Sequence, residues 1–179
     1  MVSEQAKRSI EHVFMKAAKG SLALSSDDSV SIDVLPANRL TEITEKNIVV
    51  LTISSFLFRL LTVFHIDETA VTRGYFNKDG GERTFEDGFS EVGNMCCGAM
   101  NRDLQRYFPH LGMSTPYMLS DRCVPFLKDL NPGYMARYTI TINASVQLHA
   151  TLCLCEYAPI DFVVDMSVEE EETGALEMF

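Results

Sequence analysis

The amino-acid sequence predicts an α+β fold in which a mainly antiparallel sheet carries long helices packed on one face. Two segments, 3–19 and 85–106, repeat apolar residues with the period of an amphipathic helix. Five other segments have the alternating or continuously apolar character of strands: 30–34, 48–54, 57–66, 134–143 and 146–157. Short turns separate the last four into two pairs, which is typical of β-hairpins and favours antiparallel pairing.

Length and charge limit the class of protein and its partners. The 179 residues suit one domain, predicted over 1–165, followed by an acidic and flexible tail over 166–179. The net charge of −10 disfavours nucleic acid and membrane surfaces as partners, because both are anionic. The five cysteines are an odd set and the N-terminus lacks an apolar signal core, so we expect a cytoplasmic protein.

The first half of the chain is predicted to contain one helix and a buried hairpin. The helix over 3–19 is expected to stop at Gly20. The apolar run 48–66 is long enough to cross a membrane, but Arg59 lies near its middle, so two buried strands are the better interpretation. Residues 67–84, which include NKDGGER, are predicted to be a turn or a mobile loop.

The second half is predicted to contain the long helix and a second hairpin. A connector containing Pro109, Gly112 and Pro116 follows the helix and leads into a short strand near 116–121. Residues 124–133 are predicted to be a loop that ends in Asn-Pro-Gly. The strands that follow alternate strongly around Ala144-Ser145.

The helix predicted over 85–106 has two distinct faces. The apolar side is the expected core face and consists of Phe85, Phe89, Val92, Cys96, Ala99 and Met100. The polar side consists of Asp87, Glu91, Asn94, Gly98 and Gln105, with Arg102 at its flank. Because Glu91 and Asn94 are three residues apart, their side chains are neighbours on the helix surface.

Two interpretations of this polar side stay open on the residue pattern alone. It is either an ordinary solvated face or a surface with a function. Asp87 in the first turn already favours the helix dipole. Gly93 and Gly98 each cost the helix about 1 kcal/mol relative to alanine. Such glycines either serve packing or let another surface approach the helix backbone.

The same residues resemble a known signature. Asp87-x3-Glu91-x2-Asn94, followed by 21 residues and Pro116, is similar to the motif of the CheC/CheX/FliY chemotaxis phosphatases. The surrounding SEVGNMCCGAMN and MSTPYML resemble that family's helix and strand entry. Only one such motif is present, which makes the chain most similar to the single-motif CheX type.

The resemblance implies hydrolysis of the phospho-aspartate of a CheY-type response regulator in chemotaxis signalling. Asn94 would position the attacking water, and Glu91 would pair with the regulator's active-site lysine. Asp87 would be a secondary contact or only a cap. The resemblance further implies that Gly98 gives clearance to the partner, that Arg102 contacts it, and that Pro116 shapes the backbone.

Cofactors and assembly follow from the same resemblance. The protein would need no cofactor of its own, since Mg²⁺ would belong to the regulator. A homodimer formed through sheet edges is expected. The alternative is a catalytically inactive interaction module of the same fold, in chemotaxis or flagellar switching.

The cysteines and histidines suggest weaker hypotheses. Cys153 and Cys155 share one strand face, but with Cys123 or His149 they match no zinc-binding spacing, so no metal site is predicted. The four histidines are scattered and match no nucleophile motif. A thiol-based redox sensor using Cys96-Cys97 is a third hypothesis. Separately, Cys97 is about 60° from Asn94 around the helix, so we expect it to border the polar side.

Overall fold

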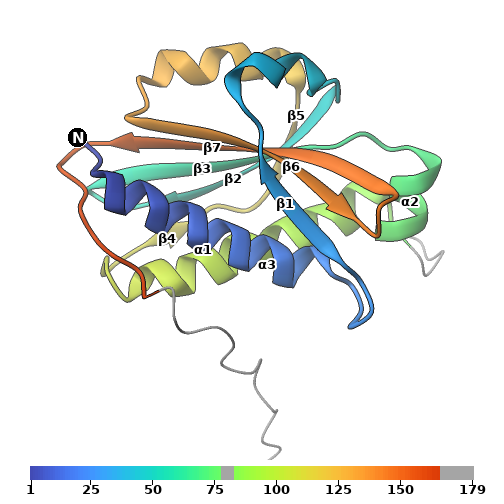
Figure 1. The fold of residues 1–179 in the computed structure, drawn as a ribbon, viewed down its shortest axis with the longest axis horizontal. Helices are drawn as coiled ribbons and strands as arrows, with labels where there is room; N and C mark the ends of the chain where they lie inside the picture. The colour runs from blue at the N-terminus through green and yellow to red at the C-terminus, as the bar shows by residue number, and fades with distance from the viewer. Residues whose placement is uncertain (78–82, 166–179) are drawn as a thin grey trace, which may run out of the picture.

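The computed structural model describes residues 1–77 and 83–165, and its centre is one antiparallel sheet (Figure 1). The seven strands are β1 (Val30–Val34), β2 (Asn47–Ser54), β3 (Phe58–His65), β4 (Gly112–Met113), β5 (Tyr117–Ser120), β6 (Tyr134–Ile142) and β7 (Val146–Glu156). Their spatial order is β1-β6-β7-β3-β2-β4, and β5 also pairs with β2. The antiparallel pairing confirms the predicted fold class. The predicted tail, 166–179, lies outside the described residues.

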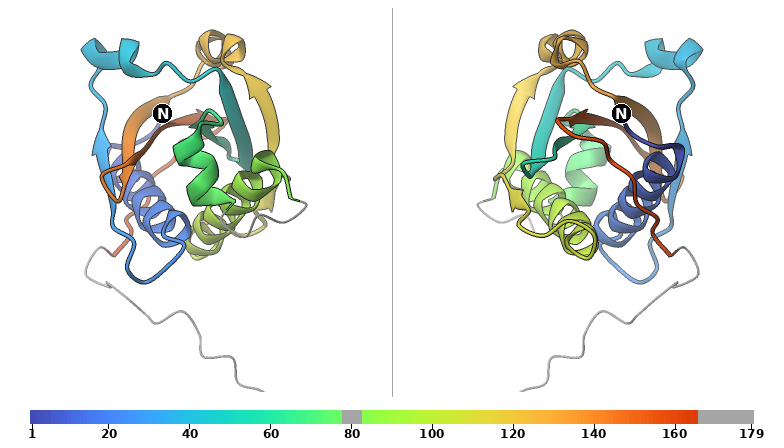
Figure 2. Two further views of the ribbon diagram at one scale, coloured as in Figure 1. Left: turned by 90° about the vertical axis from the view of Figure 1, so that its right-hand side faces the viewer. Right: turned by 90° about the vertical axis from the view of Figure 1, so that its left-hand side faces the viewer.

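Two long helices, α1 (Glu4–Leu22) and α3 (Phe85–Gln105), lie side by side on one face of the sheet (Figure 2). The Ser3 side chain caps α1 by accepting a hydrogen bond of 3.0 Å from a backbone N–H of the first turn. Helix α1 continues past the predicted stop at Gly20, because Leu22 in its last turn is fully buried. Tertiary burial therefore outweighs the local stop signal.

Aromatic side chains fill the layer between these helices and the sheet. The Phe14 ring of α1 lies 6.3 Å from the Phe64 ring of β3 and 4.9 Å from the Tyr138 ring of β6. The Phe89 ring of α3 meets Phe64 edge-on at 5.7 Å. All four side chains are fully buried, so they fix which side of each helix faces the sheet.

The apolar run 48–66 forms the hairpin of β2 and β3, as predicted. The Ser55 N–H donates a 2.9 Å hydrogen bond to the Phe58 carbonyl and closes the turn. No helix within residues 1–77 and 83–165 combines the length and apolar character needed to cross a membrane.

Two segments predicted to be loops contain helices. Within 67–84, helix α2 (Ala70–Phe76) begins at Thr69, which forms a capping box with Thr72. Its weak helix formers are stabilised by packing, because the Tyr75 hydroxyl donates to the Leu22 carbonyl at 2.8 Å and the adjacent Phe76 ring is buried. The prediction of a turn or mobile loop was wrong for 70–76, whereas most of NKDGGER, 78–82, lies outside the described residues.

The second such segment is the 3₁₀ helix η2 (Asp121–Leu130), where 124–133 was predicted to be a loop. Ser120 caps it, and Leu127 packs against the sheet. Together with the 3₁₀ helix η1 (Ala37–Glu42), it lies on the side of the sheet opposite α1 and α3 (Figure 2). The sheet therefore has a thick helical cover on one face and a thin cover on the other.

Candidate functional site

The N-terminal end of α3 is fixed by Thr84 and Asp87. The Asp87 N–H donates to the Thr84 side-chain oxygen at 3.1 Å, while the Thr84 hydroxyl donates to the Asp87 carboxylate at 2.7 Å. Hydrogen bonds from the Thr84 side chain and backbone hold the pKa of Asp87 below its usual value. Asp87 thus has a capping role, one of the two roles that the sequence left open for it.

The inward side of α3 is the predicted core face. It is buried at Phe85, Phe89, Val92, Cys96, Met100 and Leu104. Ala99 is half-buried. Gly93 is also buried against β2, where an added Cβ would lie 3.2 Å from Leu51 Cδ1. Gly93 therefore serves the close approach of helix and sheet, not the approach of a partner.

The vicinal thiols are both fully buried, so the expectation that Cys97 borders the polar side was wrong. The buried arc of α3 is wider than its apolar stripe, because the helix packs on β2 and also on the edge strand β4. Burial raises the pKa of the Cys97 thiol to about 12, and it raises that of Cys96 as well. Neither thiol forms a thiolate near neutral pH, which removes the basis of the redox hypothesis.

The outward side of α3 carries Glu91, Asn94, Gly98 and Arg102, and we call these four residues the α3 stripe. Glu91 and Arg102 are exposed, and Asn94 and Gly98 are half-buried. Among the described residues, neither Glu91 nor Asn94 has a hydrogen-bond or ion-pair partner. The stripe therefore presents a carboxylate and an amide whose hydrogen-bonding groups no other described residue uses.

Gly98 differs from Gly93 in its surroundings. An added Cβ at Gly98 would meet only Arg102, with Nη1 at 3.7 Å, which is an ordinary contact. Packing within the chain therefore does not require a glycine at this position. The guanidinium of Arg102 lies back along the helix over Gly98, in the direction that helical side chains normally take.

Pro116 lies between the short strands β4 and β5, at the sheet edge beside β2. Just before it, Ser114 pairs with Thr52 of β2. The Ser114 N–H donates to the Thr52 carbonyl at 2.9 Å, and the Thr52 N–H donates to the Ser114 hydroxyl oxygen at 3.0 Å. Since proline cannot donate to a ladder, it divides the edge into two short strands. This location agrees with a backbone role for Pro116.

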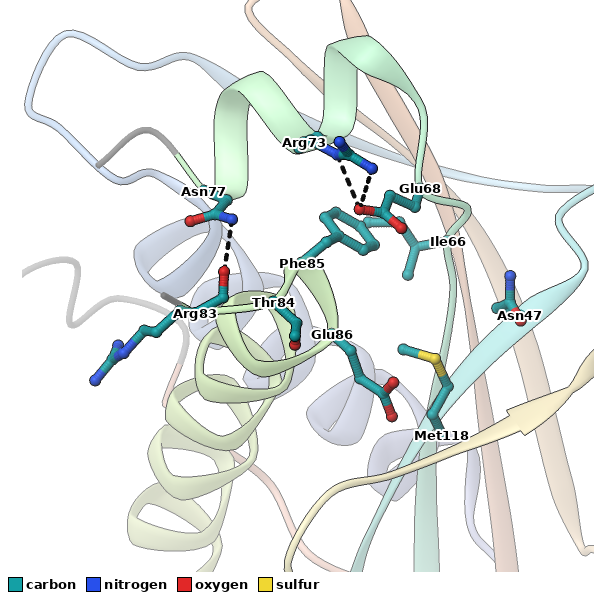
Figure 3. A pocket seen from close by; sticks show the side chains of 10 residues that line it. All are labelled: Asn47, Ile66, Glu68, Arg73, Asn77, Arg83, Thr84, Phe85, Glu86 and Met118. Atoms are coloured by element: carbon teal, nitrogen blue, oxygen red, sulfur yellow. Dashed lines mark hydrogen bonds and ion pairs between the residues drawn. The ribbon is translucent and has the colours of Figure 1, made fainter. Parts of the chain in front are cut away.

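A cleft of about 510 Å³ lies at the N-terminal end of α3 (Figure 3). It is lined by Asn47, Ile66, Glu68, Arg73, Asn77, Arg83, Thr84, Phe85, Glu86 and Met118. Much of its rim is internally paired: Arg73 binds Glu68 at 2.8 Å, and the Asn77 amide donates to the Arg83 carbonyl at 2.9 Å. The sequence contains no signal for this cleft, because its walls come from β2, α2, α3 and β5.

A second cluster missed by the sequence lies under η1 and η2. His65 and His149 are directly opposite each other on β3 and β7, and both are buried. His65 Nε2 lies 2.9 Å from the Thr151 hydroxyl oxygen, and His149 Nδ1 lies 2.7 Å from Glu45 Oε1. Burial lowers the pKa of His65 to about 4. The strand register brings the two histidines together, and their spacing along the chain does not predict the pair.

Metal binding finds no support in this cluster or elsewhere in the described residues, where no three His, Cys, Asp or Glu side chains converge as ligands. Burial alone would raise the pKa of Glu45, but its hydrogen bond with His149 and further hydrogen bonds lower it. The cluster is therefore a buried polar network of the sheet.

Taken together, the fold and the α3 stripe define a class of protein: an antiparallel α+β domain with an unpaired acid and amide on the outer side of its second long helix. No family model and no curated protein matches the sequence. Solved structures of CheX and CheC-like proteins, in contrast, match nearly their whole length to this chain.

CheX from Vibrio vulnificus is 14% identical with a TM-score of 0.57, covering 81% of this chain and 98% of that one. A chain of the CheX–CheY–BeF3–Mg²⁺ complex from Borrelia burgdorferi is 15% identical with a TM-score of 0.57, covering 83% and 98%. A CheC-like superfamily protein from Shewanella sp. PV-4 is 10% identical with a TM-score of 0.55, covering 82% and 97%. The chain therefore has the fold of CheX and CheC-like proteins, which confirms the resemblance suggested by the motif at the level of the fold.

Proposed function

We propose that this protein is a CheX-like phosphatase that hydrolyses the phospho-aspartate of a CheY-type response regulator. The observation that carries the proposal is the Glu91–Asn94 pair on α3, in a fold shared with CheX. Glu91 is exposed, Asn94 is half-buried, and neither side chain has a partner among the described residues. A solved CheX is bound to CheY with BeF3 and Mg²⁺, which supports a regulator as the partner.

The chemistry needs little from the phosphatase. The water oxygen bonds to phosphorus while the bond from phosphorus to the aspartyl oxygen breaks. The aspartate leaves as a carboxylate, the phosphate keeps one proton, and the other passes to solvent. An acyl phosphate is already activated, so positioning the water in line is the main task.

Asn94 and Glu91 suit two separate parts of this task. A neutral amide both donates and accepts hydrogen bonds, so Asn94 can orient the water without changing its charge. The Glu91 carboxylate lies one turn earlier on the same side of α3 and is free to pair with a lysine of the regulator. Mg²⁺ would be supplied by the regulator, and the phosphatase would hold no cofactor of its own.

The test measures the lifetime of a phosphorylated CheY protein with wild type, Asn94→Ala and Glu91→Ala. Wild type should shorten the lifetime. Asn94→Ala should abolish this effect while still binding, and Glu91→Ala should weaken binding as well. Gln147→Ala, an exposed amide change on β7 away from the α3 stripe, is the matched control. A wild-type protein that binds CheY without shortening the lifetime would instead support the non-catalytic interaction module.

We also propose a homodimer formed through a sheet edge. In support, the edge strand β5 exposes Tyr117 and Leu119 and pairs on one side only among the described residues. A sedimentation mass equal to one chain at micromolar concentration would exclude this assembly.

A further inference from the structure

The starting observation is the position of Arg102 on the α3 stripe. Arg102 is exposed, and among the described residues it has no hydrogen-bond or ion-pair partner. Its neighbour Asp103 points elsewhere and binds Lys16 of α1 at 3.1 Å. Arg102 is thus a cation without a partner among the described residues, on the candidate surface of a chain with net charge −10. Solubility alone does not explain it.

The spacing along α3 puts Asn94 between opposite charges. Glu91 precedes it by about 4.5 Å along the helix axis, at 1.5 Å per residue. The Arg102 backbone lies about 12 Å beyond Asn94 by the same rise. However, its guanidinium returns over Gly98, with Nη1 3.7 Å from an added Cβ there, which is about one turn from Asn94. Carboxylate, amide and guanidinium thus form one row.

Charges within the row do not neutralise each other. The guanidinium lies over Gly98, which is seven residues or about 10 Å along the helix from Glu91 and too far for an ion pair. A group seated against the Asn94 amide would therefore meet a negative charge on one side and a positive charge on the other. Such a row is complementary to a ligand that carries a positive group at one end and a negative group at the other.

A phosphorylated receiver site has this division, on the assumption of the proposed function. If Glu91 binds the regulator's lysine, that lysine contributes less to neutralising the phosphoryl group. The group carries close to two negative charges near neutral pH and offers three acceptor oxygens. A planar guanidinium matches such oxygens in pairs, and a developing charge on the transferring group is stabilised in the same way.

We propose that Arg102 contacts the phosphoryl oxygens of the regulator and thereby makes binding selective for the phosphorylated form. This inference rests on the proposed function but assigns a separate role to each residue. Asn94 positions the water, Glu91 pairs with the lysine of the regulator, and Arg102 contacts the phosphoryl group. The guanidinium makes only an ordinary contact with the Gly98 position, so the clearance expected there is left to the partner.

The experiment measures the affinity for a CheY protein with and without beryllofluoride and Mg²⁺, together with the hydrolysis rate of the phosphorylated form. Arg102→Ala should reduce the preference for the beryllofluoride form about tenfold or more, since a hydrogen bond between charged groups is worth about 1.5–3 kcal/mol. Arg102→Lys should restore part of the preference because it keeps the charge. The loss should be larger at low salt.

Arg122→Ala is the matched control. Arg122 is an exposed arginine on η2, on the opposite face of the sheet, so it gives the same change in net charge without touching the stripe. Thermal unfolding of all variants should be unchanged, which separates a contact with the partner from a folding defect.

The outcomes separate the two proposals. If wild type hydrolyses but Arg102→Ala behaves like Arg122→Ala, the Arg102 contact is overturned and the phosphatase stands. If wild type binds the beryllofluoride form preferentially without hydrolysing, and Arg102→Ala loses the preference, the phosphatase fails and the contact stands. A wild type with equal affinity for both forms, or a loss that follows a lowered Tm, overturns the contact.

Discussion

The two faces of the sheet are built in different ways. On the side of α1 and α3, a continuous aromatic layer contains Phe14, Phe64, Phe89 and Tyr138. On the side of η1 and η2, a smaller apolar cluster is interrupted by the buried histidines of β3 and β7, and Leu127 is the buried residue that η2 contributes. The α3 stripe belongs to the first face, on the outer side of its cover.

The different construction of the two covers affects which residues each face of the sheet can carry. The thick helical layer stabilises α3 through its inward side, so its outward side can carry poorly helix-forming residues such as Asn94 and Gly98. The thin layer does not provide this stabilisation, and its buried polar network makes the free energy of unfolding depend on protonation. Mutations on the two faces should therefore change the free energy of unfolding by different amounts and with a different dependence on pH.

The largest expected effect compares the two covers directly. Phe89→Ala should lower the free energy of unfolding by about 3–5 kcal/mol, because the ring is fully buried and packs 5.0 Å from Phe76 as well as against Phe64. Leu127→Ala should cost about 2 kcal/mol, since its 9% exposure lets the site relax. Urea unfolding at pH 7 measures both. Equal costs would show that η2 packs as tightly as α3.

The next effect sharpens the comparison through pH. Burial lowers the pKa of His65 to about 4, below the value of about 6.5 in the unfolded chain. As pH falls below 6.5, the unfolded chain takes up a proton that the folded protein refuses until about pH 4. Stability associated with His65 is thus present above pH 6.5 and decreases toward pH 4. The loss between pH 7 and pH 5 should be about 2 kcal/mol.

The groups facing His65 define the control. Glu45 and Asp121 favour its protonated form, whereas His149 and Arg137 oppose it. His65→Gln removes the titration and keeps a hydrogen-bonding side chain near Thr151, so its unfolding free energy should fall less between pH 7 and pH 5 than that of wild type. His12→Gln on α1 should keep the wild-type dependence. Identical slopes for wild type and His65→Gln would contradict the assignment.

Residue patterns predicted the long helices and the strand hairpins better than the short helices. Periodicity identified α1, α3 and both hairpins, because apolar side chains there face one continuous layer. It missed α2 and η2, whose helical form depends on contacts with distant residues, such as the Tyr75 hydroxyl with Leu22 and Leu127 with the sheet. Local propensity contains no record of those contacts.

The candidate site shows the same limit on a smaller scale. The Glu91–Asn94 pair follows from helical spacing, and the structure leaves Glu91 exposed and Asn94 half-buried. The burial of Cys97 does not follow from spacing, because the edge strand β4 widens the contact area of α3. Nor does spacing reveal that the Arg102 guanidinium lies over Gly98, which depends on a side-chain rotamer.

The smallest effect concerns two glycines that the sequence presents as equivalents. Gly98→Ala should raise the free energy of unfolding by about 1 kcal/mol, the usual helix preference for alanine, because the new Cβ meets only Arg102 at 3.7 Å. Gly93→Ala should gain nothing, since its Cβ would press on the buried Leu51 side chain at 3.2 Å. Matched urea titrations at pH 7 measure the difference.

The functional consequence runs opposite to the gain in stability. If Gly98 is kept for the partner, the more stable Gly98→Ala protein should dephosphorylate a CheY protein more slowly than wild type. Gly93→Ala should hydrolyse normally wherever it remains folded. A Gly98→Ala protein that is both more stable and fully active would contradict this role. Gly98 would then lower the stability of the helix without any benefit to partner binding, as a tolerated helix defect.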